Sequence, residues 1–198
     1  MRDKRKEPLR LEGKTVILEE IAPKYFSYVV EWRNNPEMNK YLNQPFTLTE
    51  EKEREWYENV YLKDDTQGLM IMLDREMGTP FGTRGWTHLD LVKRQFVSGR
   101  LLVGNLEYRA SIPYVESGFV MSDYLYTIVD IMYSHVVREN RKVISLNKHE
   151  GFVENTDVIQ YPEECLVNGM KLVELFRTRE MYEQSKKKWA QYLPEIYS

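Results

Sequence analysis

Residues 68–103 read GLMIMLDREMGTPFGTRGWTHLDLVKRQFVSGRLLV, a stretch of short apolar or alternating runs interrupted by glycine. The runs cover residues 68–73, 83–91 and 96–103. Runs of this length, separated by residues that favour turns, are typical of β-strands. Because the connections between them are short, we predict three consecutive antiparallel strands in the middle of the chain.

The segments before this stretch predict a strand and two helices. Residues 15–21 are apolar and β-branched and end before Pro23, which indicates a strand. A helix is predicted from residue 24 to 33 because Tyr25, Tyr28, Val29 and Trp32 recur at helical spacing. The pattern Thr47 to Glu50 resembles a capping box and predicts a second helix that continues to about Leu62.

After residue 103 the pattern predicts one long helix followed by a strand. Asp123 is a plausible N-cap, and the apolar residues that follow it predict a helix with one buried face, formed by Leu125, Ile128, Val129, Met132, Val136 and Val137. Residues 142–146 then predict a strand that is reached by a crossover and pairs in parallel.

The last quarter of the chain predicts a hairpin and a helix. Gly151-Phe152-Val153 is a candidate short strand. Asn168-Gly169 is a strong hairpin signal, with residues 171–177 as the returning strand. A charged helix is predicted over residues 179–192.

Composition limits the class of protein. The chain has 198 residues, is 42% hydrophobic and has a formal net charge of −3, which favours a single domain and gives no basic field for nucleic acid or an anionic membrane. No apolar run has the length of a signal peptide or membrane span. Cys165 is the one cysteine, so neither a disulfide nor a metal site is expected. We predict a cytoplasmic protein with a disordered leader at residues 1–10 and one domain over 11–198.

The predicted fold class is α/β, a mixed and mostly antiparallel sheet flanked by helices in the order β-α-α-β-β-β-α-β-β-β. This order and three local strings resemble the GNAT superfamily of N-acetyltransferases, in the branch of ribosomal-protein N-terminal and amino-sugar acetyltransferases. The strings are EWRNNPE at 31–37, FGTRGW at 81–86 and VGNLEYR at 103–109. The resemblance implies transfer of an acyl group, most simply acetyl, from acetyl-CoA to a primary amine.

The resemblance also implies where the acyl-CoA would bind. In the family, the fourth strand splays from the fifth, and the exposed strand edge pairs with the pantetheine arm. The turn that follows binds the pyrophosphate through backbone N–H groups at a helix N-terminus. These features correspond here to Leu101, Leu102 and Val103 on the strand and to Arg109, Ala110 and Ser111 on the turn.

Two departures from the family pattern stand out. After Arg109 there is no glycine until Gly118, Pro113 lacks an N–H group, and the predicted helix begins only near Asp123, which makes the link longer than the family's tight turn. The family also has a helix of the form Asn-x-x-Ala-x-x-x-Tyr before a Gly-Phe pair. We match its asparagine with Asn147, a residue expected on the cofactor side, and Gly151 then follows too soon for such a helix.

The proton transfer needs a base, and the family's glutamate is replaced by Ser98. His88 and Asp90 share one face of a predicted strand, and His88 is the first choice because imidazole titrates near neutrality. His149 is the second choice. The alternative for His88 is a surface or half-buried strand histidine, and for Asp90 it is a turn residue at a strand end. His149 has a similar alternative, and His135 is expected to be a packed or solvated helix residue.

Four residues are candidates for the acceptor pocket: Trp32, Arg33, Asn34 and Trp86. Aromatic faces would hold a sugar or base ring and an arginine would pair with phosphate or carboxylate. Core packing is the alternative for both tryptophans.

The predicted acceptor is the amino group of a nucleotide-linked amino sugar, which rests on the resemblance alone. Acetylation of a protein N-terminus and a GNAT-shaped binding or regulatory protein without transferase activity remain alternatives. A monomer or homodimer is expected.

Overall fold

A computed structural model describes residues 3–42, 44, 46–157, 159–161, 166–167 and 169–193. Its main sheet has the strand order β1-β2-β3-β4-β5-β6-β9-β7, and β8 pairs with β9. Neighbouring strands are antiparallel except β5 and β6, which run parallel. The strands are β1 Arg10–Glu12, β2 Val16–Glu20, β3 Gly68–Asp74, β4 Pro80–Asp90, β5 Gln95–Val103, β6 Ile131–Val137, β7 Val153–Glu154, β8 Leu166–Val167 and β9 Met170–Thr178.

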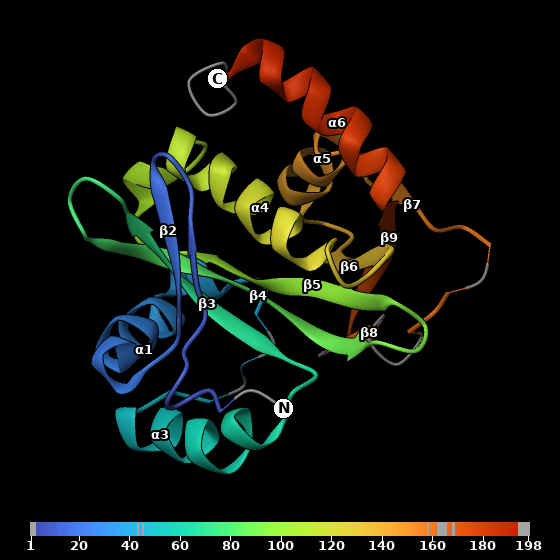
Figure 1. Ribbon diagram of the computed structural model, residues 1–198. Coiled ribbons are helices and arrows are strands. Elements are labelled where there is room, and N and C mark those ends of the chain that lie inside the picture. Colours follow the sequence, from blue (N-terminus) through green and yellow to red (C-terminus); the bar gives the residue numbers. More distant parts are fainter. Residues whose placement is uncertain are drawn as a thin grey trace.

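Helices cover both faces of this sheet (Figure 1). Helices α1 and α3 lie on one face, and α4, α5 and α6 lie on the other. Each face has its own apolar core, because alternate residues of β2 and β3 point to opposite sides. The helices are α1 Phe26–Asn34, α2 Pro36–Asn39, α3 Glu50–Asn59, α4 Ile112–Leu125, α5 Arg141–His149 and α6 Arg179–Tyr192, with short 3₁₀ turns η1 Pro23–Tyr25, η2 Tyr61–Lys63 and η3 Leu106–Tyr108.

The strands and helices predicted between residues 15 and 103 are confirmed. Strand β2 and the three antiparallel strands β3, β4 and β5 lie where the sequence indicates them, and α1 and α3 follow the predicted helices. The Thr49 side chain caps α3 by accepting from the backbone N–H of Lys52. At the other end of the chain, α6 covers Arg179–Tyr192 as predicted, and β9 is the predicted returning strand.

The predicted helix that begins at Asp123 is wrong. Asp123 lies near the end of α4, and residues 131–137 form strand β6. Strand β6 lies between β5 and β9, and most of its residues are buried, on both faces. A strand buried on both faces loses its polar alternation, so its apolar residues also fit a helical period.

The predicted strand at 142–146 is also wrong. These residues belong to α5, whose N-cap Asn140 accepts from the backbone N–H of Val143. Helix α5 therefore lies between β6 and β7, where no helix was predicted. Strand β7 begins at Val153, at the end of the predicted Gly151–Val153 strand.

The N-terminal segment is packed rather than a disordered leader. Lys4 is buried, and its Nζ donates to the carbonyl oxygens of Tyr61 at 2.9 Å, Asp64 at 2.7 Å and Gln67 at 2.9 Å. This ammonium group ties residues 3–9 to the turn that follows α3. Two other sequence features, Cys165 and Asn168, lie outside the described residues.

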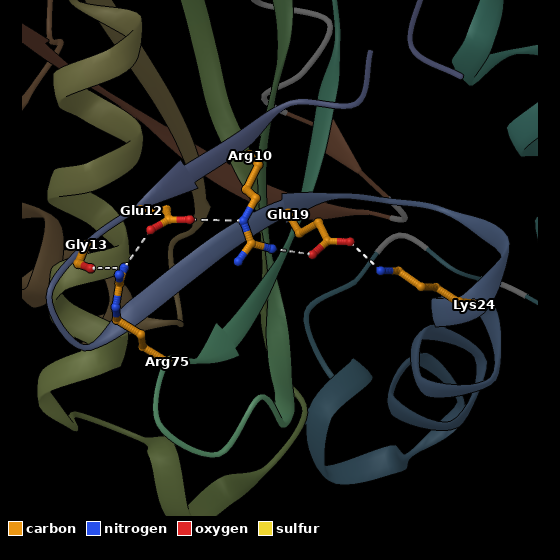
Figure 2. A network of polar contacts seen from close by, with 6 residues as sticks. All are labelled: Arg10, Glu12, Gly13, Glu19, Lys24 and Arg75. Carbon is orange, nitrogen blue, oxygen red and sulfur yellow. Dashed lines mark hydrogen bonds and ion pairs between the residues drawn. The ribbon is translucent and has the colours of Figure 1, made fainter. Parts of the chain in front are cut away.

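Exposed ion pairs connect β1, β2 and the β3–β4 turn (Figure 2). Arg10 contacts Glu12 at 3.1 Å and Glu19 at 2.8 Å. Arg75 reaches Glu12 at 2.9 Å, and Lys24 pairs with Glu19. Exposed pairs of this kind each contribute about 0–1 kcal/mol, so the edge is held mainly by its backbone ladder. Within the described ranges, no helix is long and apolar enough to cross a membrane.

Candidate active site

Strands β5 and β6 separate before either of them ends. Their parallel ladder runs from Gln95 opposite Ile131 to Ser98 opposite Ser134. No later pair joins the two strands in the described chain, although β5 continues to Val103. Backbone polar groups along the separated edges need water or a ligand as partner, because an unpaired buried group costs about 1–3 kcal/mol.

A β-bulge in β5 accounts for the separation. The register between β4 and β5 shifts so that Arg100 and Leu101 together lie opposite Arg84. Arg100 has φ 54°, in the left-handed region, and its carbonyl oxygen accepts a 2.7 Å hydrogen bond from Thr83 Oγ1. Bulges bend a strand, and a non-glycine residue in this conformation costs about 1–3 kcal/mol. The bulge therefore turns β5 away from β6 just past their last pair.

A cavity of about 760 Å³ opens at this separation and continues between β6, α4 and α5. Its wall includes the three strand residues that the resemblance assigns to the pantetheine arm and the turn residues assigned to the phosphates. All seven cofactor-side candidates line it: Leu101, Leu102, Val103, Arg109, Ala110, Ser111 and Asn147.

The turn before α4 is tight, contrary to the long link predicted from the sequence. Helix α4 begins at Ile112, and the Ser111 side chain caps it by accepting from the backbone N–H of Tyr114 at 3.3 Å. Pro113 lies in the first turn, where N–H groups have no helical partner in any case. Ala110 has φ 59°, a conformation that favours glycine. The turn thus combines a left-handed residue with a capped helix N-terminus and contains no glycine.

The helix that we expected to be absent after the strand is present as α5. The spacing Asn140-x-x-Val143-x-x-x-Asn147, followed by Gly151, has the form of the family's Asn-x-x-Ala-x-x-x-Tyr helix. Asn147 therefore occupies the tyrosine position and not the asparagine position. It is 8% exposed, and its Nδ2 donates to Ser134 Oγ at 3.2 Å. An amide at this position cannot act as an acid toward a thiolate.

Sequence reasoning missed His135. It follows Ser134, the last residue of β6 that pairs with β5, and lines the cavity. Its Nε2 lies 2.9 Å from Glu174 Oε2, and its side chain is 5% exposed. Its Nδ1 is buried and has no hydrogen-bond partner among the described residues. A strand assignment for residues 131–137 would have placed this histidine beside the splay.

Glu174, which lies on β9, fixes the position of the His135 side chain. Besides the histidine, its carboxylate accepts from Asn155 Nδ2 at 2.7 Å and from the backbone N–H groups of Gln160 at 2.9 Å and Tyr161 at 3.1 Å. Burial tends to raise the pKa of Glu174, but these hydrogen bonds outweigh it and hold the pKa below its ordinary value. The carboxylate is therefore charged at neutral pH and fixes one imidazole nitrogen.

The predicted bases lie outside the linings of both cavities described here. His88, with φ 53°, is exposed near the β4–β5 turn and contacts Thr87 Oγ1 at 3.1 Å. The Asp90 carboxylate accepts from the backbone N–H groups of Val92 and Lys93 at 2.9 Å each, which makes it a turn residue. His149 is exposed at the end of α5.

A second cavity of about 810 Å³ lies on the opposite face of the sheet, under α1 and α3. It shares Leu42, Arg100 and Leu102 with the first cavity, so the two meet at the β5 bulge. Its wall also carries Val29, Arg33, Phe46, Leu48, Lys52, Glu53, Trp56, Leu69 and Thr83.

Of the four acceptor candidates, Arg33 lines this second cavity. Trp32 is buried against Gly104, where an added Cβ would lie 2.0 Å from the indole ring, and Trp86 is buried across Gly68. The Asn34 side chain bridges the backbone of Leu48, accepting at 2.9 Å and donating at 2.8 Å.

No cluster of three or more His, Cys, Asp or Glu side chains in the described part of the chain could hold a metal ion.

No family model and no curated protein sequence matches the chain. Solved structures do. Spermidine N-acetyltransferase from Vibrio cholerae, in complex with CoA and spermine, has a TM-score of 0.71 and 18% identity, covering 86% of this chain and 99% of that one. Apo FdhC, a nucleotide-linked sugar GNAT, has a TM-score of 0.74 and 17% identity, covering 94% and 99%.

A GCN5-related N-acetyltransferase from Brucella melitensis is also similar, with a TM-score of 0.76 and 16% identity, covering 94% of this chain and 86% of that one. The resemblance inferred from the local strings is thus confirmed at the level of the fold. This chain has the fold of the GNAT superfamily of N-acetyltransferases.

Proposed function

We propose that the chain is an acyl-CoA-dependent N-acyltransferase that transfers an acyl group, most simply acetyl, to a primary amine. The observation that carries the proposal is the β5–β6 separation, which opens into the first cavity beside the N-terminus of α4. An extended ligand with amide groups and a phosphate end matches that combination, because it can pair with a strand edge and with free N–H groups of a helix.

In this proposal the strand edge at residues 101–103 pairs with the pantetheine amides. The pyrophosphate takes the turn before α4, where the left-handed Ala110 and the capped first turn leave backbone N–H groups for an anion. The exposed Arg109 is available to pair with a phosphate. Asn147 contributes to the wall without an acid–base role.

The reaction is direct attack of the amine on the thioester carbonyl, in which the C–N bond forms and the C–S bond breaks. A backbone N–H of the bulged strand stabilises the oxyanion. His135, held by Glu174, is the residue that we assign to proton transfer in place of His88. Its Nδ1 accepts the proton that leaves the amine, and the imidazolium returns that proton to the departing CoA thiolate.

For the acceptor we propose the amino group of a nucleotide-linked amino sugar. FdhC, which has this fold, is a nucleotide-linked sugar GNAT, whereas the similar protein from Vibrio cholerae is a spermidine N-acetyltransferase. The two neighbours differ in the charge of the acceptor, which is a polycation for spermidine and an anion for a nucleotide-linked sugar.

Isothermal titration calorimetry with acetyl-CoA tests the donor site. The Ser111→Asp variant keeps a good N-cap and a favourable charge for the helix dipole, but its carboxylate repels phosphates. We expect saturable binding to the unchanged protein and about tenfold weaker binding to Ser111→Asp. Ser111→Asn, an uncharged cap, is the matched control and should bind like the unchanged protein.

Absence of binding at millimolar acetyl-CoA would overturn the transferase proposal and leave a binding or regulatory protein with this fold. If the donor binds, release of CoA thiol in the presence of peptides with free N-termini, compared with amino sugars, separates the protein N-terminal alternative from the sugar.

A further inference from the structure

Besides the exposed Lys52, three charged side chains from separate segments line the second cavity. They are Arg33 at the end of α1, Glu53 on α3 and Arg100 at the β5 bulge. Glu53 is 1% exposed, and its Oε1 is buried with no hydrogen-bond partner among the described residues. The Arg33 guanidinium likewise has no hydrogen bond to any described residue.

This arrangement is costly for a structural role. A buried carboxyl without a hydrogen bond destabilises the fold, and a structural cluster would join it to the arginines directly. Burial raises the pKa of Glu53, and the charges of Arg33 and Arg100 only partly oppose that rise. A buried carboxyl with a raised pKa in a cavity is typical of a functional group.

Arg100 is fixed at the junction of the two cavities. Its guanidinium donates to Gln67 Oε1 and lies 5.2 Å from the centre of the Trp56 ring. The same residue forms the left-handed bulge that separates β5 from β6. A ligand that touches Arg100 in the second cavity is therefore adjacent to the strand edge on which the thioester is proposed to lie.

Charge determines which amine fits. The second cavity carries the cations Arg33, Lys52 and Arg100 against the single carboxyl of Glu53. Lys52 is exposed and donates to the Thr47 carbonyl at 3.1 Å, so the two arginines are the cations inside. An excess of positive charge repels a polycation and attracts an amine that also carries an anion.

We infer that the second cavity binds the acceptor, and that the acceptor is a primary amine with an anionic group of the phosphate or carboxylate class, as in a phosphorylated or nucleotide-linked amino sugar. Glu53 accepts a hydrogen bond from the amino group, and Arg33 and Arg100 hold the anion. Trp56 offers an aromatic wall to a ring. This inference rests on the proposed transfer reaction for the orientation of the amine, but its binding step does not.

The test uses glucosamine 6-phosphate and glucosamine as probes, which differ in the anion alone, with spermidine as the polycation. By calorimetry without donor, glucosamine 6-phosphate should bind at least about tenfold more tightly than the other two, because a charge-assisted hydrogen bond contributes about 1.5–3 kcal/mol. Arg33→Met should remove that difference. Arg54→Met, an exposed arginine on α3 outside the cavity lining, is the matched control and should retain it.

With acetyl-CoA present, Glu53→Gln should lower kcat/KM for glucosamine 6-phosphate about tenfold or more and leave acetyl-CoA affinity unchanged. Equal or tighter binding of spermidine, or a Glu53→Gln variant with unchanged kcat/KM, would overturn the acceptor inference while acetyl-CoA binding still supports the transferase. If acetyl-CoA does not bind but the sugar phosphate does, the transferase proposal fails and the anion–amine site stands.

Discussion

Replacing Glu174 by Gln tests how the candidate proton-transfer residue is held. The Glu174 side chain has no exposed surface and accepts from four donors, which are His135, Asn155 and the backbone N–H groups of Gln160 and Tyr161. A glutamine offers one carbonyl oxygen and turns an NH₂ group toward donors that it cannot satisfy. Hydrogen bonds to a charged group contribute about 1.5–3 kcal/mol each, and breaking a buried charged network costs about 3–5 kcal/mol.

We therefore expect Glu174→Gln to lower the free energy of unfolding by about 3–5 kcal/mol at pH 7, measured by urea denaturation. The pH dependence follows from the lowered pKa of Glu174. A carboxyl with a lower pKa in the folded state stabilises fully above its unfolded pKa of about 4.3, and this contribution is lost as the pH falls through the folded value. The difference between the two proteins should be constant from about pH 6 to 8 and shrink below about pH 4.3.

Glu154→Gln is the control, because Glu154 is partly exposed on β7 and pairs with Arg138 only at 3.7 Å. It should change the free energy of unfolding by less than about 1 kcal/mol. A loss below about 1 kcal/mol for Glu174→Gln, or an equal difference at pH 4 and pH 7, would refute the view that an ionised Glu174 organises its four donors.

Two further substitutions test buried or strained features near the first cavity. Ala110→Gly should raise the free energy of unfolding by about 0.5–1 kcal/mol, since φ 59° suits glycine, and a lower melting temperature in calorimetry would contradict this reading of the turn. Arg84 is 6% exposed with Nε and Nη2 unpartnered among the described residues, so Arg84→Met should raise the free energy of unfolding by about 1–3 kcal/mol in urea denaturation. A destabilised Arg84→Met protein would show that the guanidinium contributes to the ligand-free fold.

Elements fixed by local signals could be predicted from the sequence. Helix α6 has the bounds that its charge pattern indicated, and Thr49 caps α3 as the capping pattern required. The three central strands follow their apolar runs. In each of these the decisive interactions lie within one segment of the chain.

The region from residue 110 to 150 could not be predicted in this way because its signals conflict. Strand β6 is apolar on both faces, which hides its period of two. The pattern Ser111-Ile112-Pro113 is an N-cap followed by proline in the first helical turn. It is a stronger signal for a helix start than Asp123, but the absence of the family's glycines drew the predicted start away from it. The error moved one helix by about a dozen residues and removed another, and the apparent long link and the apparent missing helix both followed from it.

The second cavity lay beyond sequence reasoning for a different reason. Arg33, Glu53 and Arg100 are far apart in the chain, and each alone is an ordinary charged residue of a helix or strand. Only the packing of α1 and α3 against the same face of the sheet brings them together in one cavity (Figure 1). A site made by the convergence of separate segments has no local pattern to detect.

The altered turn was the main argument that the protein has lost transferase activity. The backbone conformation of Ala110 and Arg100 contradicts that argument. A turn released from a ligand-binding role would relax, since each non-glycine residue in the left-handed region costs about 1–2 kcal/mol. Ala110 and Arg100 both keep that conformation, one at the start of α4 and the other at the bulge that opens the sheet. Both strained residues line the first cavity. His88 and Arg94, near the β4–β5 turn, also have left-handed backbone, but at Arg100 and Ala110 that conformation shapes the wall of the first cavity. A ligand that uses the cavity explains why these two strained positions are kept better than drift of an inactive fold does.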